Sequence, residues 1–431
     1  MFALASGACA RPEVVQSAAN PPSALPSAAE PLSGSVEPAA VQPDPEPRGL
    51  DPSLADRVPL WLPRLYGALH ELAAGGRDRH VRILWFGDSH TAADFWSGAV
   101  RHALQQRFGA GGAGLVLLGR RMYRHALAQL STSGGWRPIP RTAAATWLQA
   151  DGVLGLAGLG AVPTSDDAGV ALALNAGTAS AGPLRWQLLY RLPRPGSAFQ
   201  VQLGDEPPRE IRAGVGERRP SGLESASLSS AGAAELRLGG FVDEPELFGV
   251  IIERESSGVV LDTLGINGAR AATPLAWNAD AWVAELEARQ PDLVVLAYGT
   301  NEVGDTAPMS EYQAHYAGLL ERVRSAAPDA DCLLLGPTDR VAKDWTSMPR
   351  VALLDRTGRQ IAAELGCAFF SPLQAMGGPG SLRRWAFSNP QLARRDRVHL
   401  LASGYRRLGI SLVEQIVASF QTCYPDAVLA P

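Results

Sequence analysis

Ser89 stands where a pattern typical of a buried strand gives way to a helical one. Residues 81–86 are nearly all apolar, and apolar residues recur at helical spacing from 92 to 104. Ser89 is therefore predicted to occupy a strand-to-helix turn, with its hydroxyl at the carboxyl end of a sheet and near the first free amides of the helix. A serine in that position is suited to acyl transfer through attack on an ester carbonyl.

A base for this serine is predicted near the end of the chain. Asp396 precedes His399 by three residues, on one loop or helical turn. At that spacing the carboxylate of Asp396 can accept the Nδ1 proton of His399, which leaves Nε2 free to take the proton of Ser89. One short segment would then supply both the base and the group that orients it.

Two intervening segments are candidates for stabilising the oxyanion of a tetrahedral intermediate. Gly268 lies in the segment 265–269, and Asn301 lies in the segment 298–302, directly after the apolar run 293–297. The backbone amides of Ser89 and Gly268 and the side-chain amide of Asn301 are predicted donors, each worth about 3 kcal/mol of barrier. Taken singly, each segment is also ordinary turn or helix-capping sequence. The functional interpretation therefore depends on all four segments occurring together.

In this order the four segments resemble those of the SGNH, or GDSL-type, hydrolases, which supply a serine, a glycine, an asparagine and an Asp-x-x-His pair. Within that superfamily, the segments 87–90 and 299–302 and the glycine-rich stretch 108–114 are most similar to bacterial peptidoglycan O-acetylesterases and their O-acetyltransferase relatives. The resemblance implies a carboxylic ester hydrolase that removes O-acetyl groups from a cell-envelope polysaccharide, with peptidoglycan as the expected substrate. It implies a Ser-His-Asp acyl-enzyme mechanism with no cofactor.

Three other functions stay open at this point. An O-acetyltransferase would use the same residues and pass the acetyl group to a glycan hydroxyl instead of water. A non-catalytic carbohydrate-binding protein of the cell envelope could keep the fold without turnover. A lipase or thioesterase would need a wide apolar channel for a long acyl chain.

The elements that must position these residues predict an α/β fold. Strand-like and helical segments alternate on both sides of a central stretch, so we expect a three-layer, flavodoxin-like domain with a parallel sheet. The central stretch instead has alternating apolar residues between Gly, Pro and Ser, which predicts an all-β sandwich insert, similar in position to the carbohydrate-binding-like domain of the esterase relatives. The predicted boundaries are a disordered linker at 1–50, the α/β domain at 51–150 and 261–425, and the insert at 151–260.

The N-terminal segment is rich in Ala, Pro and Ser and has little to build a core, which is typical of a linker. Residues 4–9 resemble the end of a bacterial lipoprotein signal, with Cys9 as the lipidated residue. We therefore expect an exported protein in the periplasm or cell envelope, with a lipid anchor as one hypothesis and an incidental cysteine in a disordered tail as the other.

The composition is that expected of a soluble enzyme. Of 431 residues, 46% are hydrophobic, and 39 basic against 43 acidic residues give a formal net charge of −4. The near-neutral balance without a basic block argues against nucleic acid as the main partner. No zinc-ligand spacing and no phosphate loop is present, so no metal site is predicted. We expect a monomer.

Several further side chains are of interest. Trp345 and Trp385 are candidates for stacking on a glycan, and Trp186 is predicted to be a core residue rather than a sugar platform. Glu302 and Asp339 follow strands near the expected crevice and could bind substrate hydroxyls or cap a helix. The cysteines of the later part, Cys332 and Cys367, are interpreted as buried thiols. The remaining histidines, expected to line the pocket or serve in packing or at the surface, are His90, His102, His125 and His315.

Overall fold

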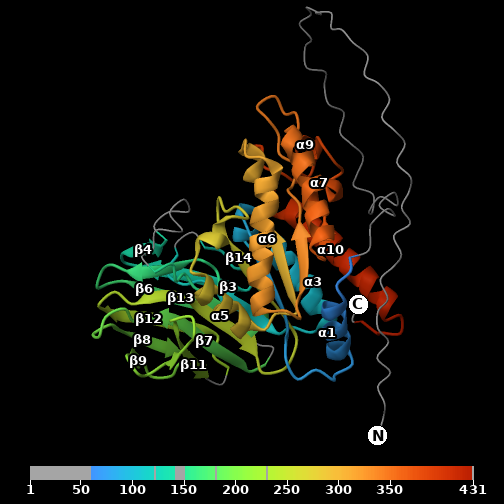
Figure 1. Ribbon diagram of the computed structural model, residues 1–431. Coiled ribbons are helices and arrows are strands. Elements are labelled where there is room, and N and C mark those ends of the chain that lie inside the picture. Colours follow the sequence, from blue (N-terminus) through green and yellow to red (C-terminus); the bar gives the residue numbers. More distant parts are fainter. Residues whose placement is uncertain (1–59, 121–122, 141–150, 180–181, 230–231, 430–431) are drawn as a thin grey trace, which may run out of the picture.

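The computed structural model describes residues 60–120, 123–140, 151–179, 182–229 and 232–429. Its first part is a five-stranded parallel sheet in the order β14-β1-β15-β16-β17 (Figure 1). The strands are β1 (Val81–Gly87), β14 (Val259–Gly265), β15 (Leu293–Ala297), β16 (Asp331–Leu335) and β17 (Ala368–Phe370). In chain order this is the 2-1-3-4-5 arrangement of flavodoxin-like folds, which confirms the predicted fold class.

Helices cover both faces of this sheet. The helices α1 (Pro63–Ala73), α3 (Trp96–Phe108) and α10 (Ala402–Cys423) enclose one apolar core with the sheet. On the other face lie α5 (Ala279–Arg289), α6 (Met309–Ala326) and α7 (Pro349–Glu364). Strands buried on both faces need apolar side chains pointing both ways, which explains why β1 and β15 are nearly continuous apolar runs. The shorter helical segments are α2 (Ser89–Ala92), η3 (Thr273–Ala276), η4 (Glu302–Gly304), α8 (Pro372–Ala375) and α9 (Ser381–Phe387).

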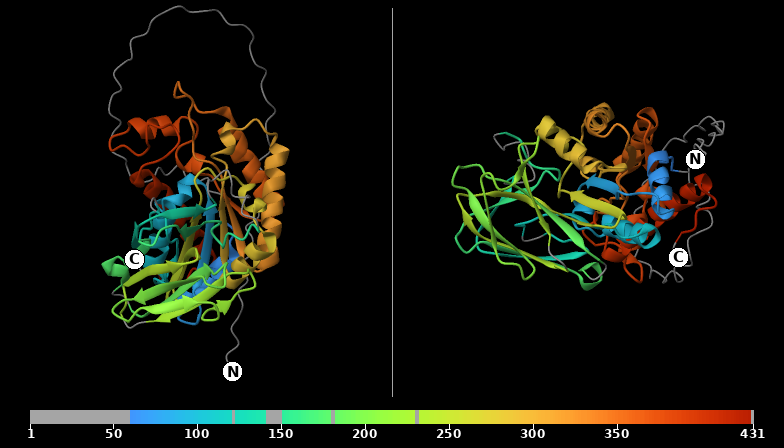
Figure 2. Two further views of the ribbon diagram at one scale, coloured as in Figure 1. Left: turned by 90° about the vertical axis from the view of Figure 1, so that its left-hand side faces the viewer. Right: turned by 90° about the horizontal axis from the view of Figure 1, so that it is seen from below.

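The insert is an antiparallel β sandwich beside the α/β domain (Figure 2). One sheet has seven strands, in the order β10-β11-β7-β13-β5-β4 with β2 also paired to β13, and the other has the order β3-β6-β12-β8-β9. Trp186 is 1% exposed in the core between the two sheets, together with Phe199 and Val250. Trp186 is thus a packing residue. The strands of the first sheet are β2 (Gly112–Val116), β4 (Trp136–Ile139), β5 (Gly160–Pro163), β7 (Leu184–Arg191), β10 (Glu217–Arg218), β11 (Glu224–Ser229) and β13 (Glu246–Arg254). Those of the second are β3 (Ala128–Ser133), β6 (Gly169–Leu174), β8 (Ala198–Leu203), β9 (Arg209–Arg212) and β12 (Glu235–Val242), with the short helix α4 (Ala176–Ala179) after β6.

The sandwich begins before the predicted boundary at 151. The strand β2 already pairs with β13, and β3 pairs with β6 along its whole length. The strand β2 is fully buried but short and glycine-rich, and β3 ends in Ser, Thr and Ser, so neither has the apolar alternation that predicts a sandwich strand. The insert therefore starts at about Gly112 and ends where β14 joins the parallel sheet.

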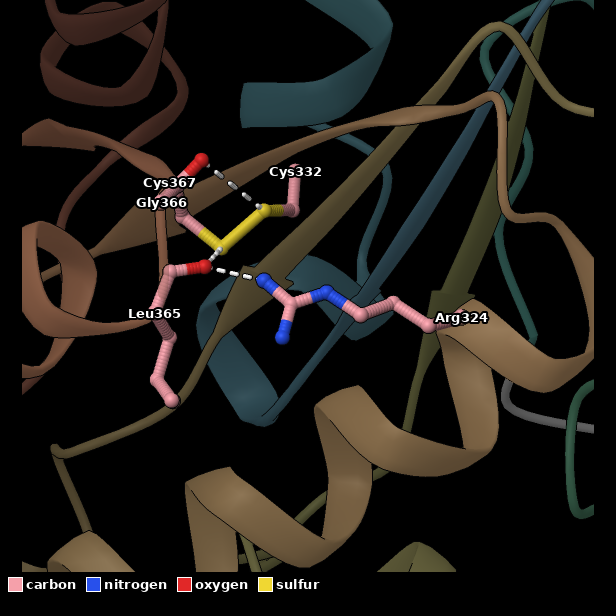
Figure 3. Close-up of a disulfide and its surroundings, with 5 residues drawn as sticks. All are labelled: Arg324, Cys332, Leu365, Gly366 and Cys367. Atoms are coloured by element: carbon pink, nitrogen blue, oxygen red, sulfur yellow. Dashed lines mark hydrogen bonds between the residues drawn. A yellow bond between two sulfur atoms is a disulfide. The ribbon is translucent and has the colours of Figure 1, made fainter.

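Cys332 and Cys367 form a disulfide, so the interpretation of both as buried thiols was wrong. Their Cα atoms are 4.9 Å apart, a separation that a disulfide spans readily. The bond ties β16 to the turn before β17, where Arg324 of α6 also donates a hydrogen bond to the carbonyl of Leu365 (Figure 3). Parallel strands at this edge of the sheet are thereby joined covalently.

A buried group of charged side chains joins the insert to the α/β domain. Glu253 of β13 accepts hydrogen bonds at 2.9 Å from Arg82 of β1 and from Arg289 of α5. Arg289 also donates to Asp262 of β14 at 2.8 Å, and Asp262 accepts from the backbone amide of Leu115 in β2. We call Arg82, Glu253, Asp262 and Arg289 the junction cluster.

The predicted linker at 1–50 and Cys9 lie outside the described residues. Among the residues that the structure does describe, no helix combines the length and apolar character needed to cross a membrane.

Candidate active site

Ser89 is the first residue of α2, directly after β1, as the sequence predicted. Asp88 caps this helix by accepting a hydrogen bond from the backbone amide of His90 at 2.9 Å. Two glycines let the turn pack closely against the strand ends. A Cβ on Gly87 would lie 2.2 Å from the Thr91 hydroxyl, and one on Gly265 would lie 2.3 Å from the amide of Ala92. Glycine is therefore required at both positions for Ser89 to sit where it does.

The structure brings Ser89, His399 and Asp396 into one hydrogen-bonded chain. The Ser89 hydroxyl lies 2.9 Å from Nε2 of His399, and Nδ1 of His399 lies 2.9 Å from Oδ2 of Asp396. The other carboxylate oxygen of Asp396 accepts hydrogen bonds from the backbone amides of Val398 and His399 at 3.0 and 2.8 Å. This is the arrangement in which a carboxylate fixes the imidazole so that Nε2 faces the serine.

These three side chains lie at the protein surface. The His399 side chain is 36% exposed and that of Asp396 is 42% exposed. Burial alone would raise the pKa of Asp396, but hydrogen bonds from the amides of His399 and Val398 and from the imidazole outweigh it and hold that pKa below its usual value. Asp396 therefore stays ionised and can stabilise a positive charge on His399.

The predicted oxyanion residues lie in the loops that follow the two strands flanking β1. Gly268, with φ of 79°, is the left-handed residue of a tight turn in which the amide of Ala269 donates to the carbonyl of Ile266. Asn301 donates from Nδ2 to the carbonyl of Ala269 at 2.8 Å, which fastens the two loops together. An amide nitrogen carries two hydrogens, so Asn301 can donate a second hydrogen bond. The roles of Gly268 and Asn301 in catalysis remain predictions.

His90 is held beneath the catalytic pair. Its ring is 3% exposed, its Nδ1 lies 2.8 Å from the Tyr405 hydroxyl, and its Nε2 lies 3.3 Å from that of Thr338. Burial, and then the nearby His399, lower the pKa of His90 to about 3. A neutral His90, 5.3 Å from His399 between ring centroids, adds no repulsion when His399 accepts a proton. These partners could not be predicted from the sequence because they come from distant segments.

A second buried network supports the segment after α2. Asp94 pairs with Arg101 of α3 and accepts hydrogen bonds from Thr263 of β14 at 2.6 Å and from the amide of Ala126 at 2.7 Å. His125, expected to be a surface or packing residue, is buried against Arg101. Sequence reasoning missed this network because its members are widely separated along the chain.

Glu302 lies beside the two loops and lines a cavity of about 630 Å³ with Arg270, His315 and Arg350 among the lining residues. One carboxylate oxygen accepts the amide of Ala271 at 2.9 Å, and burial raises the pKa of Glu302. Asp339 accepts hydrogen bonds from the Ser347 hydroxyl and from the amide of Leu382 in α9. The carboxylates of Glu302 and Asp339 thus stabilise neighbouring loops through hydrogen bonds.

Comparison with known proteins finds a family match for the C-terminal part of the chain. Residues 239–407 match the model of the GDSL-like lipase/acylhydrolase family, a range that includes Gly268, Asn301, Asp396 and His399 but begins after Ser89. These residues therefore carry a domain of this family. The predicted family and enzyme class, an SGNH-type carboxylic ester hydrolase, are thereby confirmed.

One solved structure resembles this acylhydrolase over most of its length. A peptidoglycan O-acetylesterase matches with a TM-score of 0.68 and 24% identity, over 83% of this chain and 96% of that one. Such coverage is larger than the α/β domain, so the likeness of fold extends into the β insert. Two other structures match a smaller part of the chain. TesA matches with 22% identity and a TM-score of 0.29, over 38% of this chain and 80% of that one. The esterase EstA from Pseudoalteromonas sp. matches with 17% identity and a TM-score of 0.29, over 38% of this chain and 79% of that one. None of the curated proteins matches the chain.

Among the described residues, no group of His, Cys, Asp and Glu side chains is placed to hold a metal ion.

Proposed function

We propose that this acylhydrolase removes O-acetyl groups from a cell-envelope polysaccharide, with peptidoglycan as the first candidate. The observation that carries the proposal is the hydrogen-bonded chain from Ser89 through His399 to Asp396. The likeness of fold to a peptidoglycan O-acetylesterase, including the β insert, supports the choice of substrate.

In the proposed mechanism His399 takes the proton of Ser89 while the Ser89 oxygen attacks the acetyl carbonyl. The amides of Ser89 and Gly268 and the side chain of Asn301 stabilise the oxyanion. His399 then gives its proton to the departing sugar oxygen, and an acetyl group remains on Ser89. A water molecule, deprotonated by His399, releases acetate and regenerates the serine.

The exposure of the catalytic side chains favours hydrolysis over transfer. A transferase must keep water away from its acetyl-enzyme until an acceptor hydroxyl arrives. Here His399 and Asp396 are 36% and 42% exposed, so water reaches the base directly. We therefore propose an esterase and treat transfer to a glycan hydroxyl as the second candidate.

The test is acetate release from O-acetylated peptidoglycan and from a small aryl acetate, with and without an added sugar acceptor. We expect release without an acceptor by the wild type and by His102→Ala, a control at an exposed histidine of α3, and none by Ser89→Ala. Acetylated acceptor with little free acetate would make the protein a transferase. No Ser89-dependent chemistry on either substrate would favour a carbohydrate-binding protein. A hydrolysis rate that rises from acetyl to octanoyl esters would favour a lipase or thioesterase.

We also propose an exported location, with Cys9 as the candidate for lipidation. Metabolic labelling with a fatty-acid probe should modify the wild type but not Cys9→Ser. Absence of label from the wild type would end the lipid-anchor hypothesis.

A further inference from the structure

A short hairpin, residues 340–348 between β16 and α7, contacts the loop of Asn301, the loop of His399 and the start of α9. Arg340 donates to the carbonyl of Thr300, next to Asn301, at 2.8 Å. The amide of Val341 donates to the carbonyl of Arg397, two residues before His399, at 3.3 Å. Ser347 accepts the amide of Gly380 at the start of α9 at 2.6 Å. The base of the hairpin is thereby fixed relative to both the Asn301 loop and the His399 loop.

Trp345 occupies an unfavourable backbone position at the tip of this hairpin. Its amide donates to the carbonyl of Ala342 at 3.1 Å, which closes a tight turn, and its φ is 66°. This left-handed position of a hairpin turn is the one that glycine normally fills, and a bulky side chain there is uncommon. Backbone strain of this kind gathers at functional sites, where the side chain has a use that outweighs its effect on stability.

The Trp345 ring meets a second aromatic side chain that is open to solvent. Phe387, the last residue of α9, is 47% exposed, and its ring centroid lies 4.8 Å from that of Trp345 with the planes at 68°. The guanidinium of Arg395, four residues before His399, lies 5.0 Å from the Phe387 centroid. We call Trp345, Phe387 and Arg395 the rim platform. Trp385, the other stacking candidate, is 6% exposed and belongs to the core, so it cannot serve.

The charged residues that adjoin the platform residues in the chain are mostly basic: Lys343, Arg394, Arg395 and Arg397 against Asp344 and Asp396. Arg394, Arg395 and Arg397 make no ion pair with an acidic side chain in the part of the chain that the structure describes. Arginines left without an acidic partner next to an active site attract anionic groups of a ligand. This local charge contrasts with the formal net charge of −4 for the whole chain.

From these observations we propose that the rim platform binds a pyranose ring of an acidic glycan chain, next to the acetylated sugar held at Ser89. The inference rests on the proposed function and deepens it by assigning a glycan subsite. The negative π face of an aromatic ring attracts the partly positive C–H groups on the apolar face of a pyranose, and the arginines bind carboxylates carried by the chain. A small aryl acetate has no second sugar ring for the platform to bind.

The first experiment measures kcat and KM for Phe387→Ala and Trp345→Gly with soluble O-acetylated peptidoglycan fragments and with an aryl acetate. Glycine suits the left-handed turn, so Trp345→Gly removes the ring without distorting the hairpin. We expect KM for the glycan to rise about tenfold, with kinetics on the aryl acetate unchanged. Phe387→Tyr should retain the wild-type KM. Val242→Ala, at a 52% exposed residue of the β insert, is the control.

Two results would overturn the proposal. Equal losses on both substrates would show that these residues only support the histidine loop, and an unchanged KM for the glycan would show that they do not touch it. If Phe387→Ala instead altered the oligomeric state with the glycan KM unchanged, the platform would be a contact between copies of the chain.

Binding of de-O-acetylated peptidoglycan fragments to Ser89→Ala separates this proposal from the proposed function. The platform predicts binding that weakens about tenfold in Ser89→Ala/Phe387→Ala, even if the wild type releases no acetate from the glycan. Absence of acetate release alone therefore counts against the esterase function, and absence of Phe387-dependent binding counts against the platform. Added salt should weaken binding, because the arginine contacts are exposed.

Discussion

The protein contains two groups of paired charged residues that differ mainly in burial. In the junction cluster the side chains of Asp262, Arg289 and Glu253 are 0%, 6% and 9% exposed. In the catalytic pair Asp396 and His399 are 42% and 36% exposed. Hydrogen-bond distances are similar, between 2.8 and 2.9 Å in both.

This difference separates stability from activity. Removing one partner from a buried charge pair leaves an uncompensated charge in a medium that solvates it poorly, so the free energy of unfolding falls. At the surface, water replaces the lost partner, and the stability changes little. We therefore expect substitutions in the junction cluster to lower the free energy of unfolding and substitutions in the catalytic pair to inactivate the protein without destabilising it.

The largest expected effect is that of Ser89→Ala on hydrolysis of an aryl acetate. Loss of the nucleophile should lower kcat by about 10⁴- to 10⁶-fold. The free energy of unfolding should change by less than about 0.5 kcal/mol, because the hydroxyl bonds only to a partly exposed imidazole. Steady-state kinetics and urea denaturation of the same preparation test both statements. A loss of activity that follows a loss of folded protein would contradict the separation.

Asp396→Asn should have the next largest effect. The amide cannot accept the Nδ1 proton in the way a carboxylate does, so the favoured His399 tautomer is lost. Because Asp396 is 42% exposed, water partly compensates, and we expect kcat to fall about 10²- to 10³-fold rather than further. The matched control is Asp329→Asn. Asp329 forms an ion pair with Arg64, and the two side chains are 84% and 65% exposed, respectively. Equal activity of the two variants would remove Asp396 from the mechanism.

Glu253→Gln tests the other half of the comparison. The substitution removes the carboxylate that pairs with Arg82 and leaves Asp262 as the remaining carboxylate bonded to Arg289. The free energy of unfolding should therefore fall by about 3 kcal/mol. Hydrolysis of an aryl acetate well below the unfolding temperature should stay near the wild-type rate. Asp329→Asn should cost less than about 0.5 kcal/mol. Urea denaturation measures both, and similar small losses would mean that burial does not distinguish the two groups.

The smallest expected effect concerns pH. Burial raises the pKa of Asp88 to about 7, although hydrogen bonds from His90 and Thr300 oppose this. The folded state then holds a proton that the unfolded state releases near pH 4, so stability falls as pH rises toward 7. Between pH 5 and 8 we expect the wild type to lose on the order of 2 kcal/mol more than Asp88→Asn does. Parallel denaturation profiles of the two proteins would contradict the raised pKa.

The sequence predicted the parallel sheet because apolar runs are short local patterns. It predicted the grouping of Ser89 with His399 because the four segments together resemble those of the SGNH hydrolases. Apolar runs buried on both faces identify β1 and β15, and residues at the carboxyl ends of neighbouring parallel strands meet at one edge. The start of the insert was not predictable, because β3 and β4 alternate polar and partly buried residues without a clear hydrophobic period.

Other pairings between distant segments, for which no family resemblance was stated, could not be predicted from the sequence. The Cys332–Cys367 disulfide and the contacts of Asp94 with Arg101 and Thr263 depend on which segments the fold brings together. Likewise, nothing local separates Trp345, which is half-buried at the edge of the apolar core, from Trp385 within that core, since both are single tryptophans in mixed sequence.

The most direct measurement of the central claim is covalent labelling of the active serine. A fluorophosphonate reacts with a serine oxygen only when a neighbouring base activates it. We expect stoichiometric label on the peptide that contains Ser89 in the wild type and in His102→Ala, and at least about 10²-fold slower labelling in His399→Ala. Label on another residue, or equal rates with and without His399, would contradict the assignment of Ser89 as the activated nucleophile.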